Sequence, residues 1–162
     1  MSFRFSVLRR RVLARVAAAL ALLALVGLAL PAPAHAQEAL EPLAIEAAGK
    51  VHDFKVEVMR TDSERAKGLM FRRYMAEDRG MLFDFKTEQT VAMWMRNTFI
   101  PLDMIFIGKD GRIVGVAENT EPMSERIIPS GAPALAVLEV NAGTAARLGV
   151  KAGDRVRHAL FK

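Results

Sequence analysis

The chain has 162 residues, with 23 lysines and arginines, 18 acidic residues and no cysteine. The lack of cysteine excludes disulfides, thiol nucleophiles, thiolate metal sites and thiol redox chemistry. The formal net charge of +5 would by itself suggest an anionic partner such as nucleic acid. Where the basic residues lie along the chain decides whether that inference holds.

The first 36 residues have the pattern of a secretory signal peptide. Five arginines precede an uncharged segment rich in Ala and Leu, residues 16–30, and Ala34-His35-Ala36 offers the small residues of an A-x-A cleavage site. The uncharged segment is shorter than the roughly 20 residues of a membrane-spanning helix, and no cysteine follows it that could carry a lipid. We therefore predict cleavage near Ala36 and a periplasmic or secreted protein without a membrane anchor.

Removal of this segment changes the charge of the protein. It contains five of the 23 basic residues and none of the 18 acidic ones, so 18 of each remain. The neutral remainder has no electrostatic footprint for nucleic acid, and we expect no such partner. Taking 36 residues from 162 leaves 126, enough for one domain and too few for two. The two remaining histidines, His52 and His158, lack the spacing of a zinc site. We expect no metal and no cofactor.

The domain is expected to begin after a short tether. Residues 37–42 are polar and form this tether, and residues 43–162 form a single domain. A hairpin is predicted over residues 43–59 with its turn near Gly49-Lys50. Apolar and charged residues alternate through residues 54–58, which is typical of a strand with one buried face.

Two short helices are predicted among the later strands. Thr61 and Glu64 have the spacing of a capping box and begin the first helix. The second runs from Thr144 to Leu148, with Asn141 as its cap and Gly149 ending it. Between and after the helices, a loop is predicted over residues 119–133 and strands over residues 80–85, 91–95, 102–107, 112–118 and 134–140 and near the chain end.

Seven or eight short strands without regular strand–helix alternation indicate the fold class. The pattern predicts a mainly β protein, a compact antiparallel or mixed β-sandwich or open barrel with two short helices. An α+β arrangement is the alternative.

Polar residues interrupt the apolar segment 93–107. Within its predicted strand, Met104 and Phe106 share one face, while Asp103 lies on the other face with further apolar residues, so this strand should be central. One interpretation is that Asn97, Thr98 and Asp103 satisfy backbone groups at a strand corner, which we favour because buried polar groups are usually satisfied. The other is that they line a polar pocket.

Glu139 raises the same question on a second apolar strand. We expect it to pair with Arg65 or Arg72 of the first helical region. A buried glutamate can instead have a raised pKa and act as an acid or a base. If the fold brought Glu139 and Asp103 into one pocket, the two carboxyls could act as an acid–base pair.

Five segments in this order resemble one family: ERAKGLMFR, EDRGMLFDF, WMRNTFIPLDMIFI, IVGVAENTEP and VLEVNAGTAARLGVKAGDRV. The chain is similar over about residues 45–160 to the bacterial and archaeal family of domain of unknown function 192. The resemblance implies a compact, mainly β, often exported domain, and brings no established activity, cofactor or catalytic residue. The polar positions that match the family's segments are Arg65, Arg72, Asn97, Thr98, Asp103, Glu139 and Asp154.

Three functions are compatible with these residues. We favour an exported module that binds a small molecule or a protein, or is only structural, because no nucleophile–base pair, metal spacing or phosphate loop is present. A carboxylate-dependent enzyme using Asp103 and Glu139 is the alternative. Cu(I) binding by Met93 and Met95 is least favoured, because methionine commonly fills cores. Trp94 is expected to be at least partly buried. The candidate binding cluster is Arg65, Arg72, Trp94, Asn97, Thr98, Asp103 and Glu139.

Overall fold

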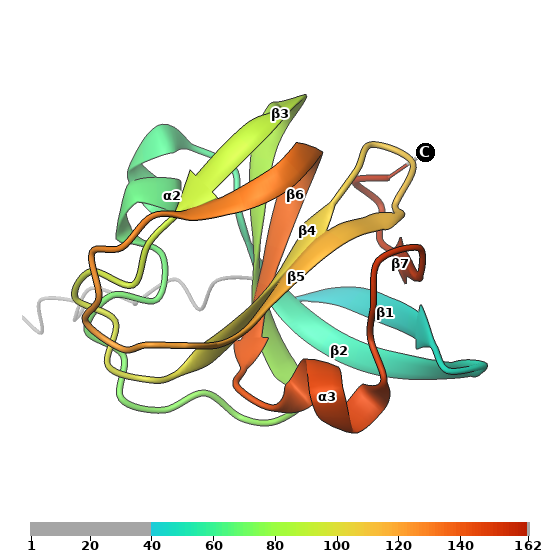
Figure 1. Ribbon diagram of the computed structural model, residues 1–162, viewed down its shortest axis with the longest axis horizontal. Coiled ribbons are helices and arrows are strands. Elements are labelled where there is room, and N and C mark those ends of the chain that lie inside the picture. Colours follow the sequence, from blue (N-terminus) through green and yellow to red (C-terminus); the bar gives the residue numbers. More distant parts are fainter. Residues whose placement is uncertain (1–39, 162) are drawn as a thin grey trace, which may run out of the picture. The chain divides into compact units, whose positions relative to one another are not determined.

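A computed structural model describes residues 40–161 (Figure 1). The predicted signal peptide and its cleavage site lie outside these residues. The elements follow one another as β1 (Glu41–Ala47), β2 (Lys50–Met59), α2 (Asp62–Lys67), β3 (Arg79–Met93), β4 (Leu102–Ile107), β5 (Ile113–Thr120), β6 (Ile128–Asn141), α3 (Thr144–Leu148) and β7 (Arg155–Arg157). The predicted mainly β fold with two short helices is confirmed. Among the described residues, no helix has the length and apolar character needed to cross a membrane.

The seven strands form one mixed sheet in the order β5-β4-β6-β3-β2-β1-β7. β2 and β3 are parallel, and the other neighbours are antiparallel. The sheet curls into a half-barrel. Its two edges are joined by a bridge between Arg112 and Arg155 and by a 2.8 Å hydrogen bond from the Val156 amide to the Gly111 carbonyl. The curling brings β1, β2 and β7 over one face of the central strands (Figure 1).

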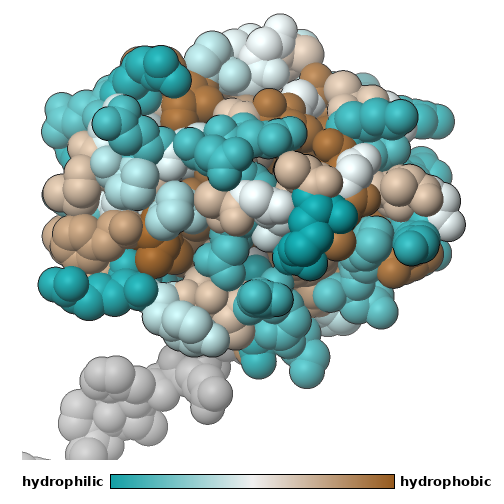
Figure 2. Space-filling view, turned by 60° about the horizontal axis from the view of Figure 1, so that its bottom comes forward, coloured by the Kyte–Doolittle hydropathy of each residue, from teal (hydrophilic) through white to brown (hydrophobic). Residues whose placement is uncertain are grey.

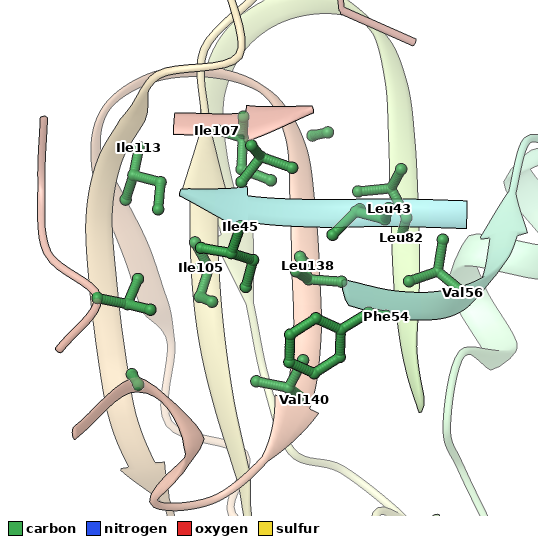
Figure 3. Close-up of a cluster of buried hydrophobic side chains, with 14 of the residues drawn as sticks. Leu43, Ile45, Phe54, Val56, Leu82, Ile105, Ile107, Ile113, Leu138 and Val140 are labelled. Atoms are coloured by element: carbon green, nitrogen blue, oxygen red, sulfur yellow. The ribbon is translucent and has the colours of Figure 1, made fainter. Parts of the chain in front are cut away.

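One core fills the inside of the curled sheet and consists mainly of branched aliphatic side chains. Ile45 of β1, Leu82 of β3, Ile105 of β4 and Leu138 of β6 are completely buried in it, and Figure 3 shows these side chains converging from different strands. We call this cluster the inner core. It contains no methionine among its buried members.

A second core covers the opposite face of the central strands and is rich in methionine. Five of its buried residues are Met59, Met75, Met81, Met95 and Met104. We call it the outer core. All six residues of β4 are buried because the strand lies between β5 and β6 and carries one core on each face. The predicted central position of this strand is confirmed.

Several predicted boundaries differ from the structure. The strands predicted over residues 80–85 and 91–95 belong to a single β3, because both parts pair with β6. The register of this pairing shifts between Asp84 and Gln89. β6 begins at Ile128, inside the predicted loop, since this segment pairs with the second half of β3. β1 begins at Glu41, within the predicted tether, where it pairs with Val56.

The first helix begins as predicted and the second does not. Thr61 and Glu64 form the predicted capping box of α2. At α3 the N-cap is Gly143, which provides no side-chain cap. Asn141, the predicted cap, is the last residue of β6. Its side-chain amide donates 2.9 Å to the carbonyl of Met75 instead.

Candidate functional site

Asp103 provides the cap that α3 lacks. Its side chain is fully buried, and one carboxylate oxygen accepts a 2.8 Å hydrogen bond from the backbone amide of Ala145 in the first turn of the helix. The other oxygen accepts a 2.8 Å hydrogen bond from the amide of Asn119. A buried carboxylate needs such partners because losing hydration is costly. Asp103 therefore joins the start of α3 to the end of β5, as the structural interpretation requires.

Glu139 lies on the opposite face of the same strands. In the register of β4 and β6, Glu139 is directly opposite Met104, and Asp103 is opposite Val140. Adjacent residues of a strand point to opposite faces, so the Asp103 carboxyl belongs to the inner-core face and the Glu139 carboxyl to the outer-core face. The two carboxyls do not share a pocket. An acid–base pair made of them is excluded.

Glu139 is buried among methionines and lacks a charged partner. It is 4% exposed and lies in register between Met81 of β3 and Met104 of β4. Within the part of the chain that the structure describes, no hydrogen bond or ion pair reaches its carboxyl. Burial raises the pKa of Glu139 to about 8. The carboxyl is therefore mostly neutral at pH 7, and can both donate and accept a hydrogen bond.

The two arginines expected to pair with Glu139 have other partners, so that prediction is wrong. The Arg65 guanidinium donates 2.7 Å to the carbonyl of Asp84 and forms an ion pair with Asp62. Arg72 forms a two-pronged ion pair with Glu57 on β2. Both arginines thus hold the α2 region to neighbouring strands.

A narrow pocket of about 30 Å³ contains Glu139, and we call it the Glu139 pocket. Four members of the predicted cluster meet in it, Arg65, Trp94, Thr98 and Glu139. Asn97 lies between the lining residues Arg96 and Thr98 but does not itself line the pocket. Arg72 and Asp103 do not line it either. Its complete lining is Arg65, Ala66, Lys67, Gly68, Leu69, Met70, Phe83, Met93, Trp94, Arg96, Thr98 and Glu139.

Three chain segments are hydrogen-bonded together beside this pocket, and two of them contribute to its lining: residues 68–74, 94–99 and 121–127, of which the last does not line it. We call them the loop surface. The Phe71 amide donates 2.8 Å to the carbonyl of Asn97, and the Met123 amide donates 3.0 Å to the carbonyl of Thr98. The middle segment is thus bonded to both of the others. Figure 1 shows these connections gathered on the side of the sheet where α2 lies.

The backbone of the loop surface is strained. Phe71, Asn97 and Met123 have φ values of 66°, 57° and 63°. The left-handed region is unfavourable for bulky side chains such as Phe and Met. Strained residues that cluster in one place are often retained for function. These three belong to three different segments of one surface.

The loop surface also exposes large aromatic side chains. Tyr74 is 78% exposed, Phe71 62% and Trp94 45%. The guanidinium of Arg96 lies 4.6 Å from the ring centre of Trp94, and the rings of Phe71 and Phe99 make an edge contact. β3 ends at Met93, so Trp94 lies beyond the strand in which we expected it. Figure 2 shows one face of the domain, on which apolar areas lie between hydrophilic residues.

Most residues of the loop surface were not among the predicted site residues. By residue type, four of its exposed side chains would be expected in a core: Phe71, Tyr74, Phe99 and Met123. Their exposure depends on the turns of the three segments, which the sequence does not show. The useful signal was compositional, since arginines are interspersed with aromatic residues in the segments FRRY and WMRNTF. Paired in this way, the two residue types are typical of binding surfaces.

Two other features of the domain bear on ligand binding, the Met93–Met95 pair and a hollow on the β1–β2 hairpin. Met95 is fully buried, and its sulfur accepts a 3.2 Å hydrogen bond from the Thr120 hydroxyl, so a Cu(I) ion held by Met93 and Met95 would have to enter the outer core. In residues 40–161, no three His, Asp or Glu side chains gather as metal ligands. A wider hollow of about 380 Å³ on the β1–β2 hairpin is lined by Pro42, Leu43, Ala44, Asp53, Phe54, Lys55, Asp78 and Arg157.

The chain is similar to one protein family and to solved structures from two bacteria. Residues 43–158 match the family of domain of unknown function 192, described as an uncharacterized ACR. A structure from Sinorhizobium meliloti 1021, described as that of a candidate transcription regulator, is 50% identical with a TM-score of 0.74, covering 76% of this chain and 97% of that one. A protein of unknown function from Novosphingobium aromaticivorans DSM 12444 is 44% identical with a TM-score of 0.71, covering 74% and 85%. No curated protein matches the chain.

Proposed function

Because this chain belongs to the family of domain of unknown function 192, which carries no assigned activity, we propose a function from its site: it is an exported binding module that docks a partner protein on its loop surface. The observation that carries this proposal is the strain of two bulky residues, Phe71 and Met123, whose φ values are positive on one exposed surface. A fold without a task for this surface would relieve that strain with glycine or asparagine at both positions, as Asn97 already does at the third.

A protein fits this surface better than a small molecule does. Sites for small molecules usually enclose about 300–1,000 Å³, whereas the Glu139 pocket measures about 30 Å³. Exposed tyrosine, tryptophan and arginine are enriched in protein interfaces and contribute much of their binding energy. Tyr74, Trp94 and Arg96 supply these residue types. The pocket then receives one group of the partner rather than a whole ligand.

The description of the Sinorhizobium relative raises DNA as another partner. We favour a protein because the chain after residue 36 contains 18 basic and 18 acidic residues. DNA binding rests mainly on positive charge that neutralises phosphates. A balanced chain lacks the net attraction from which such binding begins.

Export is tested on the protein made by its native host. We expect the N-terminal sequence of the mature protein to begin at Gln37, with the protein recovered from the periplasm or the medium. Full-length protein that stays in the membrane fraction would contradict both the cleavage and the neutral mature charge.

Docking is tested with a photo-crosslinking amino acid placed at single positions in the native host. Tyr74 is the test position on the loop surface, and Val51 of β2, 52% exposed, is the matched control. We expect an adduct of defined mass from Tyr74 and not from Val51, and its loss when Trp94→Ala is added. Equal adducts from both positions, or none from Tyr74, would overturn the proposal.

A further inference from the structure

We propose that the Glu139 pocket binds a carboxylate, namely the C-terminal carboxylate of the protein that docks on the loop surface. This inference rests on the proposed docking function and adds the chemistry of the group that enters the pocket. It follows from the charges around the pocket, its size, the protonation of Glu139 and the aromatic side chains at its mouth.

The charged groups around the pocket favour an anion. Arg65 and Lys67 of α2 and Arg96 of the segment after β3 line it. The Arg65 guanidinium has Asp62 as its ion-pair partner, and the Arg96 guanidinium lies over the ring of Trp94. Glu139 is the only acidic side chain in its lining. Within residues 40–161, none of the three cations forms an ion pair with the Glu139 carboxyl. Lys67 and Arg96, which have no ion-pair partner among residues 40–161, and one buried acid therefore border the same space, which a bound anion can bridge.

A metal ion or an ammonium group does not fit this environment. The three basic side chains would repel a cation entering the pocket. A neutral carboxyl is also a weak ligand for a cation, because the ionised form is the one that binds metals. The same neutral carboxyl is an O–H donor, and its hydrogen bond to an anionic oxygen belongs to the strong, charge-assisted class.

The size of the pocket selects a terminal group. A volume of about 30 Å³ has room for about one or two water-sized groups, which suits the two oxygens of a carboxylate. The rest of the ligand must remain outside. Phe71, Trp94 and Phe99 lie exposed on the same surface and can cover the side chains that precede a peptide C-terminus.

The binding should depend on pH because the pocket requires the proton of Glu139. The residues in register with Glu139 on the neighbouring strands, Met81 and Met104, are apolar, and the lining residue Thr98 is polar but carries no charge. Glu139, whose pKa burial raises to about 8, is therefore the group that titrates. Its neutral fraction falls about tenfold between pH 7 and pH 9, and affinity for a carboxylate should fall with it.

Trp94, the single tryptophan of the chain, lines the pocket and reports on occupancy through its fluorescence. The probes are acetate, a pool of random octapeptides with free C-termini, and the same pool amidated. We expect the free pool to change the emission at pH 7, to bind about tenfold more weakly at pH 9, and to bind more tightly than acetate. The amidated pool should leave the emission unchanged.

Variants connect the response to the pocket. Glu139→Gln keeps an N–H donor and should bind with no loss between pH 7 and pH 9, whereas Glu139→Leu should bind at least tenfold more weakly. Lys67→Ala should weaken binding several-fold, and Lys151→Ala, an exposed lysine away from the pocket, should not. Thermal melts of each variant separate lost binding from lost folding.

Several results would overturn the inference. Equal binding of the amidated pool would exclude a carboxylate, and equal affinity for acetate would assign the pocket to free small carboxylates instead of a peptide end. No emission change at millimolar peptide would also contradict it. Crosslinks from Tyr74 that persist beside such results would leave the docking proposal standing. Carboxylate binding without specific crosslinks would overturn docking, and with it the docked protein as the source of the carboxylate.

Discussion

Each face of the central strands carries one buried carboxyl group, and the two groups differ in whether they have hydrogen-bond partners. On the inner face, the Asp103 carboxylate accepts hydrogen bonds from two backbone amides, inside a core of branched aliphatic side chains. On the outer face, Glu139 is one register position away, lies between two methionines and has no partner among residues 40–161. One carboxyl completes the scaffold, and the other is left available to a ligand.

The apolar side chains around the two carboxyls also differ, in how freely they can change conformation. Isoleucine and valine have few rotamers and define a rigid inner core. Methionine has three rotatable bonds and adapts to changing neighbours, and five methionines are buried in the outer core. The strained loops lie beside this adaptable core. The rigid inner core and the adaptable outer core thus lie on opposite faces of the same sheet.

The largest effect is expected from Asp103→Ala. The substitution leaves the buried amide of Ala145 without an acceptor, at about 1–3 kcal/mol, and removes the part-buried hydrogen bond of the Asn119 amide. The free energy of unfolding should therefore fall by about 2–4 kcal/mol. Asp103→Asn retains one acceptor and should cost less. Thermal and denaturant melts of both variants beside the wild type measure this. A wild-type or higher melting temperature for Asp103→Ala would mean that Asp103 belongs to a functional site instead.

Glu139 should produce a distinct pH dependence of stability. Its pKa is about 8 in the folded protein and 4.5 in the reference state, so between these values the folded state binds more protons than the unfolded state. Unfolding free energy should therefore decrease as pH rises through this window, by about 1.4 kcal/mol per pH unit, and level off above pH 8.

Glu139→Gln is the matched control because it is neutral and has nearly the same shape. The difference in unfolding free energy between the wild type and this variant, measured by urea melts from pH 5 to pH 9, should follow that slope. A difference that does not vary with pH would show that Glu139 is ionised in the folded protein.

Relief of backbone strain should stabilise the outer face. Met123 is half exposed and has a positive φ, a conformation that costs most residues about 1–2 kcal/mol and asparagine less. Met123→Asn should therefore raise the free energy of unfolding by up to about 1 kcal/mol. Met123→Leu retains the strain and serves as the control. A loss of stability in Met123→Asn would show that the Met side chain contributes more than its backbone costs.

A small effect is also expected from replacing the two methionines of the M-x-M sequence. Met93→Leu with Met95→Leu conserves apolar volume and should cost less than about 1.5 kcal/mol at each site. The wild type should show no tight Cu(I) binding in a competition assay with a Cu(I) chelator. Stoichiometric, tight Cu(I) uptake that the double substitution abolishes would restore the copper hypothesis.

The sequence by itself determined the class of the fold, because this depends on local patterns. Alternation of apolar and charged residues marked the β2 strand, and apolar residues on both faces marked the central position of β4. The capping box of Thr61 and Glu64 began α2 where expected, since it involves backbone groups only three residues apart. The segment containing Asn97 also emerged from the sequence as a place where polar groups interrupt a core.

Only the tertiary structure decided which polar group belongs to the scaffold and which to the site. The cap of α3 comes from Asp103, 42 residues away from Ala145, so local spacing pointed to the wrong residue. Glu139 does not pair with Arg65 or Arg72, because Arg65 binds the carbonyl of Asp84 and Arg72 binds Glu57 instead. The exposure of Phe71 and Tyr74 depends on how three distant loops bond to one another. Long-range pairing sets each of these outcomes, and no local pattern of residue types encodes it.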